Sequence, residues 1–181
     1  MVSRRSHGRD PEIHDRGGSM MDHRDYSDDY IRGILGRVKT LAMVGASAHW
    51  NRPSYFAMMY LSRKGYRVIP VNPRAAGSKI LGQTAYASLR EIPEPVDMVD
   101  VFRGAAEAGP ITDDAIAIGA KVVWMQIGVR DEAAARRAEA AGLQVVMNRC
   151  PKIEYARLHG ELSWHGFNSR VISSRRRKIE R

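Results

Sequence analysis

The sequence predicts an α/β fold: one doubly wound domain with a five-stranded parallel sheet and helices on both faces. Short apolar segments alternate with helical segments from Thr40 to Gly160. The chain has 181 residues, of which 44% are hydrophobic, which is enough for one packed core and too little for two comfortable ones. We expect the Rossmann-like strand order 3-2-1-4-5. The flavodoxin-like order 2-1-3-4-5 is the alternative, and the sequence pattern separates the two poorly.

Each element follows from a local pattern. Runs rich in apolar and β-branched residues predict five strands, at residues 40–44, 66–72, 96–102, 121–128 and 143–148. Helical spacing or strong helix formers predict helices at residues 26–38, 54–65, 105–119, 131–142 and 151–160. Gly65 and Gly142 are helix-stop signals, and Pro151 suits the first turn of its helix. The turn-rich stretch after Asn72 predicts a loop with a short helix at 86–90.

The two ends of the chain differ in composition from the rest. Residues 1–29 are polar and charged without periodicity, which predicts a disordered N-terminal extension. The domain is expected at residues 30–160, followed by a basic C-terminal tail at 161–181. The formal net charge is +9, and the excess lies in the body and the tail. A basic body suits an anionic ligand such as a nucleotide, a polyphosphate or a nucleic acid, although a solvated surface is the simpler explanation of the charge alone.

Several classes of protein are disfavoured. No apolar run approaches the roughly 20 residues that cross a bilayer, and the N-terminus has no apolar signal-peptide segment. The single cysteine, Cys150, cannot form an internal disulfide and fits a reducing, cytoplasmic environment. The histidines do not pair with it at zinc spacing, so no metal site is expected.

The turn after the first strand, in "TLAMVGASAHWNRPSY" (40–55), predicts a phosphate site. Gly45 permits a tight turn and a close approach of an anion to the backbone, and Ala46 and Ser47 keep that approach open. Ser54 lies in the first turn of the next helix, whose free N–H groups attract phosphate, and Arg52 adds a guanidinium suited to pyrophosphate. The full dinucleotide fingerprint G-x-G-x-x-G is absent. A turn built only for packing is the alternative.

The end of the second strand argues against NAD. An NAD site has an acidic residue there for the ribose hydroxyls, whereas this strand runs into "VNPRAAGSK", with Asn72, Arg74 and Lys79. Positive charge at this place suits a ribose that carries a phosphate, as in NADP or coenzyme A. Two surface cations without a ligand are the alternative.

The longer motifs resemble those of the bacterial CoA-binding domain proteins, which are similar to the N-terminal domain of the succinyl-CoA synthetase α subunit. The similarity covers roughly residues 34–158 and includes "VGAS", "NRPSY", "GYRVIPVNPRAAGSKILGQTAYASLREIPEPVDMVDVFR", "AIAIGAKVVWMQIGV" and "AGLQVVMNRCPKIEYARL". It implies a Rossmann-type fold that binds coenzyme A or an acyl-CoA at the strand exits.

The resemblance also implies roles for individual residues. Gly45, Ala46, Ser47, Arg52 and Ser54 would hold the pyrophosphate. The adenosine 3′-phosphate would lie beside Asn72, Pro73 and Arg74, with Lys79 as a further contact. The adenine side would be lined by Val101, Phe102 and Arg103, and the pantetheine would run along Ile127, Gly128 and Val129.

The sequence indicates binding more strongly than catalysis. His159 and His165 do not match the phosphohistidine site of the synthetase, no catalytic residue is assigned, and a reaction stays open. The alternatives are an NADP-dependent oxidoreductase and nucleic-acid binding through the tail "SSRRRKIER" (173–181). Cys150 begins a helix between Arg149 and Lys152, which suggests a reactive thiol; an inert half-buried residue is the alternative. Oligomeric state stays open, and no membrane partner is expected.

Overall fold

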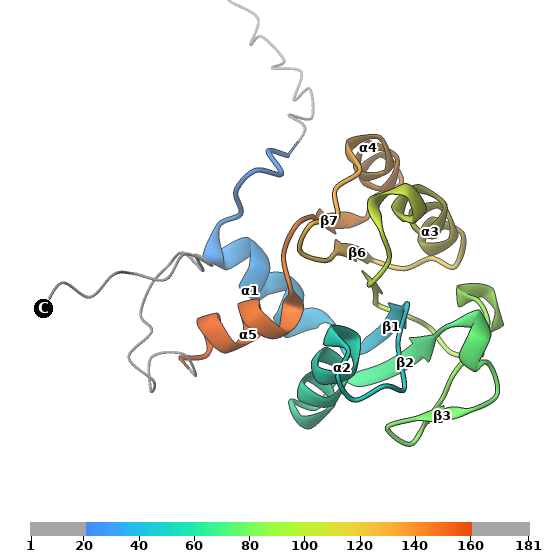
Figure 1. Cartoon of the computed structure of the whole chain (residues 1–181). Coiled ribbons are helices and arrows are strands. Elements are labelled where there is room, and N and C mark those ends of the chain that lie inside the picture. The colour runs from blue at the N-terminus through green and yellow to red at the C-terminus, as the bar shows by residue number, and fades with distance from the viewer. Residues whose placement is uncertain (1–20, 161–181) are drawn as a thin grey trace, which may run out of the picture.

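The computed structural model describes residues 21–160, which form a central sheet covered by helices on both faces (Figure 1). The main sheet contains β1 (Thr40–Val44), β2 (Arg67–Val71), β5 (Met98–Val101), β6 (Val122–Met125) and β7 (Gln144–Val146). All neighbouring strands in it are parallel. The helices are α1 (Asp28–Arg37), α2 (Pro53–Arg63), α3 (Ala105–Ala117), α4 (Glu132–Ala140) and α5 (Pro151–Leu158). The predicted fold class, five strands and five helices are confirmed.

The strand order differs from the one we expected. The sheet runs β2-β1-β5-β6-β7, which is the order 2-1-3-4-5 of its five strands and not 3-2-1-4-5. The segment after β2 explains the difference, because Tyr86 lies along the free edge of β2. The Asn72 N–H donates to the Tyr86 carbonyl at 2.9 Å, and the Tyr86 N–H donates to the Pro70 carbonyl at 3.0 Å. With that edge occupied, the third strand crosses over and pairs with β1 on its other side.

The connection between β2 and β5 also contains elements that the sequence pattern did not predict. A small antiparallel hairpin of β3 (Lys79–Ile80) and β4 (Gln83–Thr84) projects beside β2 (Figure 1). Two short 3₁₀ helices, at Pro73–Ala75 and Leu89–Glu91, flank it. The second overlaps the short helix predicted at 86–90. Strands of two residues are too short to show a periodicity, which is why the pattern missed them.

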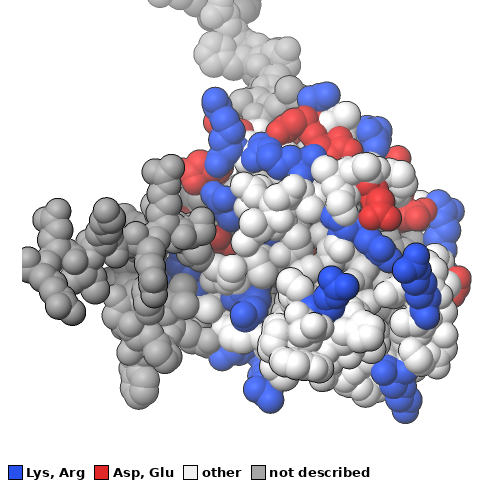
Figure 2. Space-filling view, in the orientation of Figure 1, with Lys and Arg blue, Asp and Glu red and all other residues white. Residues whose placement is uncertain are grey.

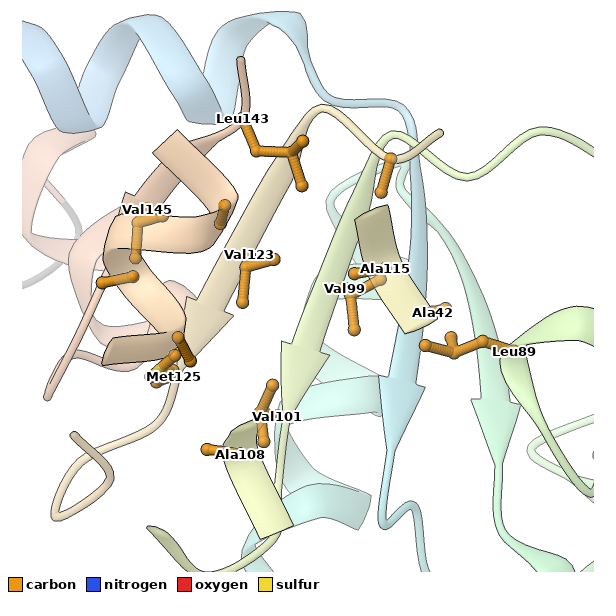
Figure 3. Packing of buried hydrophobic residues seen from close by; sticks show 14 of the residues in the cluster. Ala42, Leu89, Val99, Val101, Ala108, Ala115, Val123, Met125, Leu143 and Val145 are labelled. Atoms are coloured by element: carbon orange, nitrogen blue, oxygen red, sulfur yellow. The ribbon is translucent and has the colours of Figure 1, made fainter. Parts of the chain in front are cut away.

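Two hydrophobic clusters hold the layers together. Beneath α3 and α4, valines of the strands, such as Val99 and Val123, pack against alanines of the helices, such as Ala115 (Figure 3). Beneath α1, α2 and α5 the cluster contains larger side chains, including those of Met43, Met98 and Trp124. Trp124 and Met125 are completely buried, one in each cluster. The alternation along each strand thus places neighbouring residues in different clusters.

The folded part begins before the boundary expected at residue 30, which falls inside α1. Residues 21–27 lead into this helix and pack on the domain. His23 is buried and lies 3.1 Å from Glu139, and the Tyr26 hydroxyl accepts a hydrogen bond from the Met147 N–H at 2.7 Å. The rest of the predicted disordered extension, residues 1–20, and the basic tail, 161–181, lie outside the described residues. No helix within residues 21–160 has the length and apolar character of a membrane span.

Candidate functional site

The loops that follow the five strands meet at one edge of the sheet, because the strands are parallel. β1 and β5 are neighbours there, and their following helices leave to opposite faces: α2 packs on the Trp124 cluster and α3 on the Val123 cluster. This is the switch point at which open α/β sheets bind ligands. The observed strand order, 2-1-3-4-5, therefore places the switch point between β1 and β5, beside the Gly45 turn.

Gly45 is required by a close approach of two loops. Its φ is +92°, and a Cβ built on it would lie 2.5 Å from the Phe102 carbonyl oxygen. The Gly45 N–H donates to the Val71 carbonyl at 2.8 Å, and the Phe102 N–H donates to the Val44 carbonyl at 2.8 Å. The exits of β1, β2 and β5 are thus bound to one another. Gly45 has a packing reason of its own, and it leaves the turn open for a ligand.

Asn72 connects the first two exits. Its Nδ2 donates to the Ala46 carbonyl at 2.8 Å, and its Oδ1 accepts from the Arg74 N–H at 3.0 Å. Both ends of this amide are therefore used within the protein. Asn72 acts as a brace that fixes the Ala46 turn relative to the turn carrying Pro73 and Arg74, which are both exposed.

The start of α2 offers a site for an anion. Arg52 is its N-cap residue in an extended conformation, no side chain caps the helix, and Pro53 occupies its first turn. The positive end of the helix dipole is therefore open at the Gly45 turn. Ser54 is buried in this first turn, and the Ser47 Oγ accepts from the His49 N–H at 3.2 Å.

Three arginines belong to the segments that form this edge: Arg52 starts α2, Arg74 follows the exit of β2, and the Arg103 side chain lies beside Gly45. Arg52 and Arg74 are exposed and Arg103 is half-buried, and none of them forms an ion pair with another described residue. In Figure 2 acidic groups gather mostly in the upper part of the view, whereas separate Lys and Arg groups also lie in its lower part. This edge therefore presents the positive charge that a phosphorylated ligand needs.

A cavity of about 340 Å³ lies beside the β1, β2 and β5 exits. Its wall includes Val44, Val71, Pro73, Leu89, Arg103 and Pro110. The wall also carries two carboxylates, Glu107 and Asp114, and Asp114 is paired with Arg90. Its mainly apolar surface suits a flat aromatic base, and Arg103 suits an anionic group attached to that base. The structure thus brings together Pro73 and Arg103, which the resemblance had placed at the ribose phosphate and the adenine.

Other residues from the sequence prediction lie elsewhere. Val101 is fully buried and Val129 is 7% exposed, and both side chains belong to the cluster beneath α3 and α4. Their side chains face the core because strand alternation and the turn after β6 direct them inward. Lys79 is exposed on the hairpin, where it pairs with Thr84. Phe102 is half-buried against the other cluster.

A second cavity, of about 520 Å³, opens at the β6 and β7 exits. Ile127 is 60% exposed at its rim, and the neighbouring Gly128 N–H donates to the Asn148 Oδ1 at 2.8 Å. Residues 25–28 and Ile31 form the opposite wall. We had assigned no binding role to that segment, and its polar sequence contains no motif that indicates one.

A buried polar group lies under this end of the sheet. Asp100 is fully buried in β5; its Oδ1 accepts from the Gln126 Nε2 at 2.8 Å, and its Oδ2 has no partner. Burial raises the pKa of Asp100 to about 7. Burial, with a contribution from Asp100, also raises the pKa of the Cys150 thiol, although N–H groups at the start of α5 oppose this. The activated thiolate considered from the sequence is therefore disfavoured. Within residues 21–160 no cluster of side chains suits a metal ion.

Comparison with known proteins gives one consistent result. A model of the family described as "CoA binding domain" matches residues 39–156. The protein YneT of Bacillus subtilis is 35% identical over 126 residues, which are 70% of this chain and 92% of that protein. An ADP-forming acetate–CoA ligase of Archaeoglobus fulgidus is 31% identical over 97 residues, 48% of this chain and only 14% of the ligase.

Solved structures agree with this match. A protein from Pyrococcus horikoshii is 40% identical, with a TM-score of 0.71; the match covers 75% of this chain and 94% of that one. A protein from Thermus thermophilus is 38% identical, with a TM-score of 0.70, over 74% of this chain and 99% of that one. The matched region contains the Gly45 turn, the start of α2 and both cavity rims at the strand exits.

Proposed function

Since the chain belongs to the family of CoA binding domains, we propose that it binds coenzyme A or an acyl-CoA at the carboxyl edge of its sheet, as a binding or regulatory module without a reaction of its own. The observation that carries this proposal is the Gly45 turn beside the start of α2, which no side chain caps, with Arg52 and Arg74, which form no ion pair within residues 21–160. Its single cysteine favours a reducing environment such as the cytoplasm.

In this proposal the ligand lies across the strand exits. The pyrophosphate rests on Gly45, Ala46 and the first turn of α2, where N–H groups and the Arg52 guanidinium stabilise its charge. The adenine enters the cavity of about 340 Å³, and Arg74 with Arg103 binds the 3′-phosphate at its rim. The pantetheine then extends past Ile127 and Gly128.

Calorimetric titration tests the proposal. Purified protein is titrated with CoA, acetyl-CoA, dephospho-CoA, NADP and NAD under reducing conditions. We expect micromolar binding of CoA, weaker binding of dephospho-CoA and none of NAD. Binding of NADP without CoA would reject the proposal and favour the oxidoreductase, because Arg74 suits a 2′-phosphate equally well.

Matched variants assign the phosphates. Arg74→Ala should weaken CoA binding by roughly ten- to a hundredfold and leave dephospho-CoA binding almost unchanged, because a charge-assisted contact contributes roughly 1.5–3 kcal/mol. Arg52→Ala should weaken both ligands equally. Arg63→Ala removes a charge from the far end of α2 and should change neither. Equal losses for CoA and dephospho-CoA in Arg74→Ala would refute the role of Arg74.

A further inference from the structure

The larger cavity is built from parts of the chain that the phosphate site does not use. Its volume of about 520 Å³ lies within the roughly 300–1,000 Å³ of small-molecule pockets. One wall comes from residues 25–28 and Ile31, outside the region that matches the family. The other walls are the Ile127 loop and the first two turns of α5. The helices α1 and α5 lie side by side on one face of the sheet (Figure 1), and the cavity is lined by residues of both.

Its position follows from the proposed path of the ligand. Ile127 lies on the expected pantetheine path and also lines the cavity. Its side chain is 60% exposed, so a large apolar group is left uncovered at the rim. The thiol end of the pantetheine would therefore reach this rim, and any group attached to the sulfur would continue into the cavity.

The charges in the cavity are already paired. The Arg157 guanidinium lies 2.7 Å from Asp28 and 2.8 Å from Glu154. Arg149 lies 3.7 Å from Glu154 and 3.9 Å from Asp25. Two guanidinium groups thus face three carboxylates. A further carboxylate brought in by a ligand would find no unpaired cation among the described residues that line the cavity and would meet like charge, which is costly in a partly buried site.

The remaining wall combines Ser27, Asn148 and Cys150 with an apolar part, the aliphatic or aromatic side chains of Tyr26, Ile31, Ile127 and Ile153. Tyr26 is held in place, since its hydroxyl accepts from the Met147 N–H and its ring stacks on Tyr30. We propose that this cavity receives the acyl group of a thioester ligand, and that it selects uncharged aliphatic chains longer than acetyl. This inference rests on the proposed function and specifies its ligand.

A chain-length series tests it with the intact protein. CoA, acetyl-CoA, butyryl-CoA, hexanoyl-CoA and succinyl-CoA are titrated calorimetrically. We expect the dissociation constant to fall by roughly threefold for each methylene added from acetyl to hexanoyl, because each enters an apolar wall. Succinyl-CoA should bind at least tenfold more weakly than butyryl-CoA. Equal affinity for CoA and all its thioesters, or tighter binding of succinyl-CoA, would overturn the acyl site and leave CoA binding intact. Failure of CoA itself to bind would instead reject the proposed function.

A filling variant locates the chain. Ile153→Trp places an indole in the cavity from α5 and should abolish the dependence on chain length while the affinity for CoA stays within twofold. Leu81→Trp adds the same group on the distant hairpin turn and should preserve the series. If Ile153→Trp lowers the melting temperature sharply, Ile153→Phe provides the smaller ring. A chain-length series that persists in a folded filling variant places the acyl group elsewhere and overturns the proposal.

Discussion

The two faces of the sheet are packed with different kinds of side chain. Beneath α3 and α4 the core is made mainly of valine and alanine (Figure 3). The buried polar residue Thr112 donates its hydroxyl hydrogen bond to the Ala108 carbonyl of the same helix at 2.8 Å. Beneath α1, α2 and α5 the core contains Met, Tyr and Trp, and beside it lie Asp100 and Gln126.

The buried polar groups on the second face are concentrated near the carboxyl edge of the sheet. Asp100 precedes the last residue of β5, Gln126 follows β6, and Ser54 lies in the first turn of α2. A buried carboxyl with an unpartnered oxygen lowers stability, which an apolar residue of similar size would avoid. The first face is therefore built for packing alone, whereas the second departs from this rule at the end where we propose that the ligand binds.

Asp100→Asn should give the largest effect. Because burial raises the pKa of Asp100 from 3.8 to about 7, the folded state holds this proton more tightly than the unfolded state does. The contribution of Asp100 to stability is thus fully present below pH 3.8 and is lost as pH rises to about 7. The loss is at most about 1.4 kcal/mol per pH unit. Asparagine stays neutral at both pH values. The free energy of unfolding of the variant minus that of the wild type should therefore be about 3 kcal/mol larger at pH 8 than at pH 5.

Urea denaturation at the two pH values measures this difference. Thr112→Val, on the other face, is the matched control, and its effect on the free energy of unfolding should be the same at pH 5 and pH 8. An Asp100→Asn difference that does not change with pH would mean that Asp100 is charged in the folded protein, and the contrast between the faces would disappear.

Substitutions at two adjacent residues should give effects of intermediate size and test the comparison between the two faces. Val123 faces the α3 and α4 layer, whereas the Trp124 Nε1 donates to the Arg149 carbonyl at 2.9 Å. Val123→Ala and Trp124→Phe should each cost about 1–3 kcal/mol, the first through a cavity and the second through a lost hydrogen bond and lost volume. Only Trp124→Phe should also weaken binding of hexanoyl-CoA, because the Arg149 loop lines the larger cavity. Melting curves measure the stability of both variants, and calorimetry measures their affinity for hexanoyl-CoA. Equal losses of affinity would contradict the proposal that only the second face contributes to ligand binding.

The sequence predicted the strand ends well because they coincide with local breaks in the pattern. Gly45 and Asn72 follow β1 and β2, and both take part in the contacts between the strand exits. Strand order was not predictable in this way, because it depends on hydrogen bonds from Tyr86, which lies within a stretch that has no strand periodicity.

The sequence pattern also did not show which acidic residues are buried. Asp97 and Asp100 both flank or lie within the third strand, and an acidic side chain in such a place is expected to cap a segment or face solvent. Asp97 does so: it accepts from the N–H groups of Lys39 and Thr40 and pairs with Lys121. Asp100 is fully buried, because a central parallel strand is covered on both faces and alternation then gives no sign of which residues reach water.

The reactivity of Cys150 provides the smallest effect and links the buried acid to the strand exits. The raised pKa of this thiol leaves little thiolate at pH 8, and the thiol is 9% exposed. We expect alkylation by iodoacetamide in the folded protein to be at least tenfold slower than in urea. In Asp100→Asn the negative charge that helps to raise the thiol pKa is absent, so the folded variant should react a few-fold faster than the folded wild type at pH 8, and equally fast at pH 5, where Asp100 is neutral in both. Thr112→Val should leave the rate unchanged. A folded wild-type protein that reacts as fast as the unfolded chain would show an accessible thiolate at the start of α5, and the second face would then carry a nucleophile in place of a neutral buried cluster.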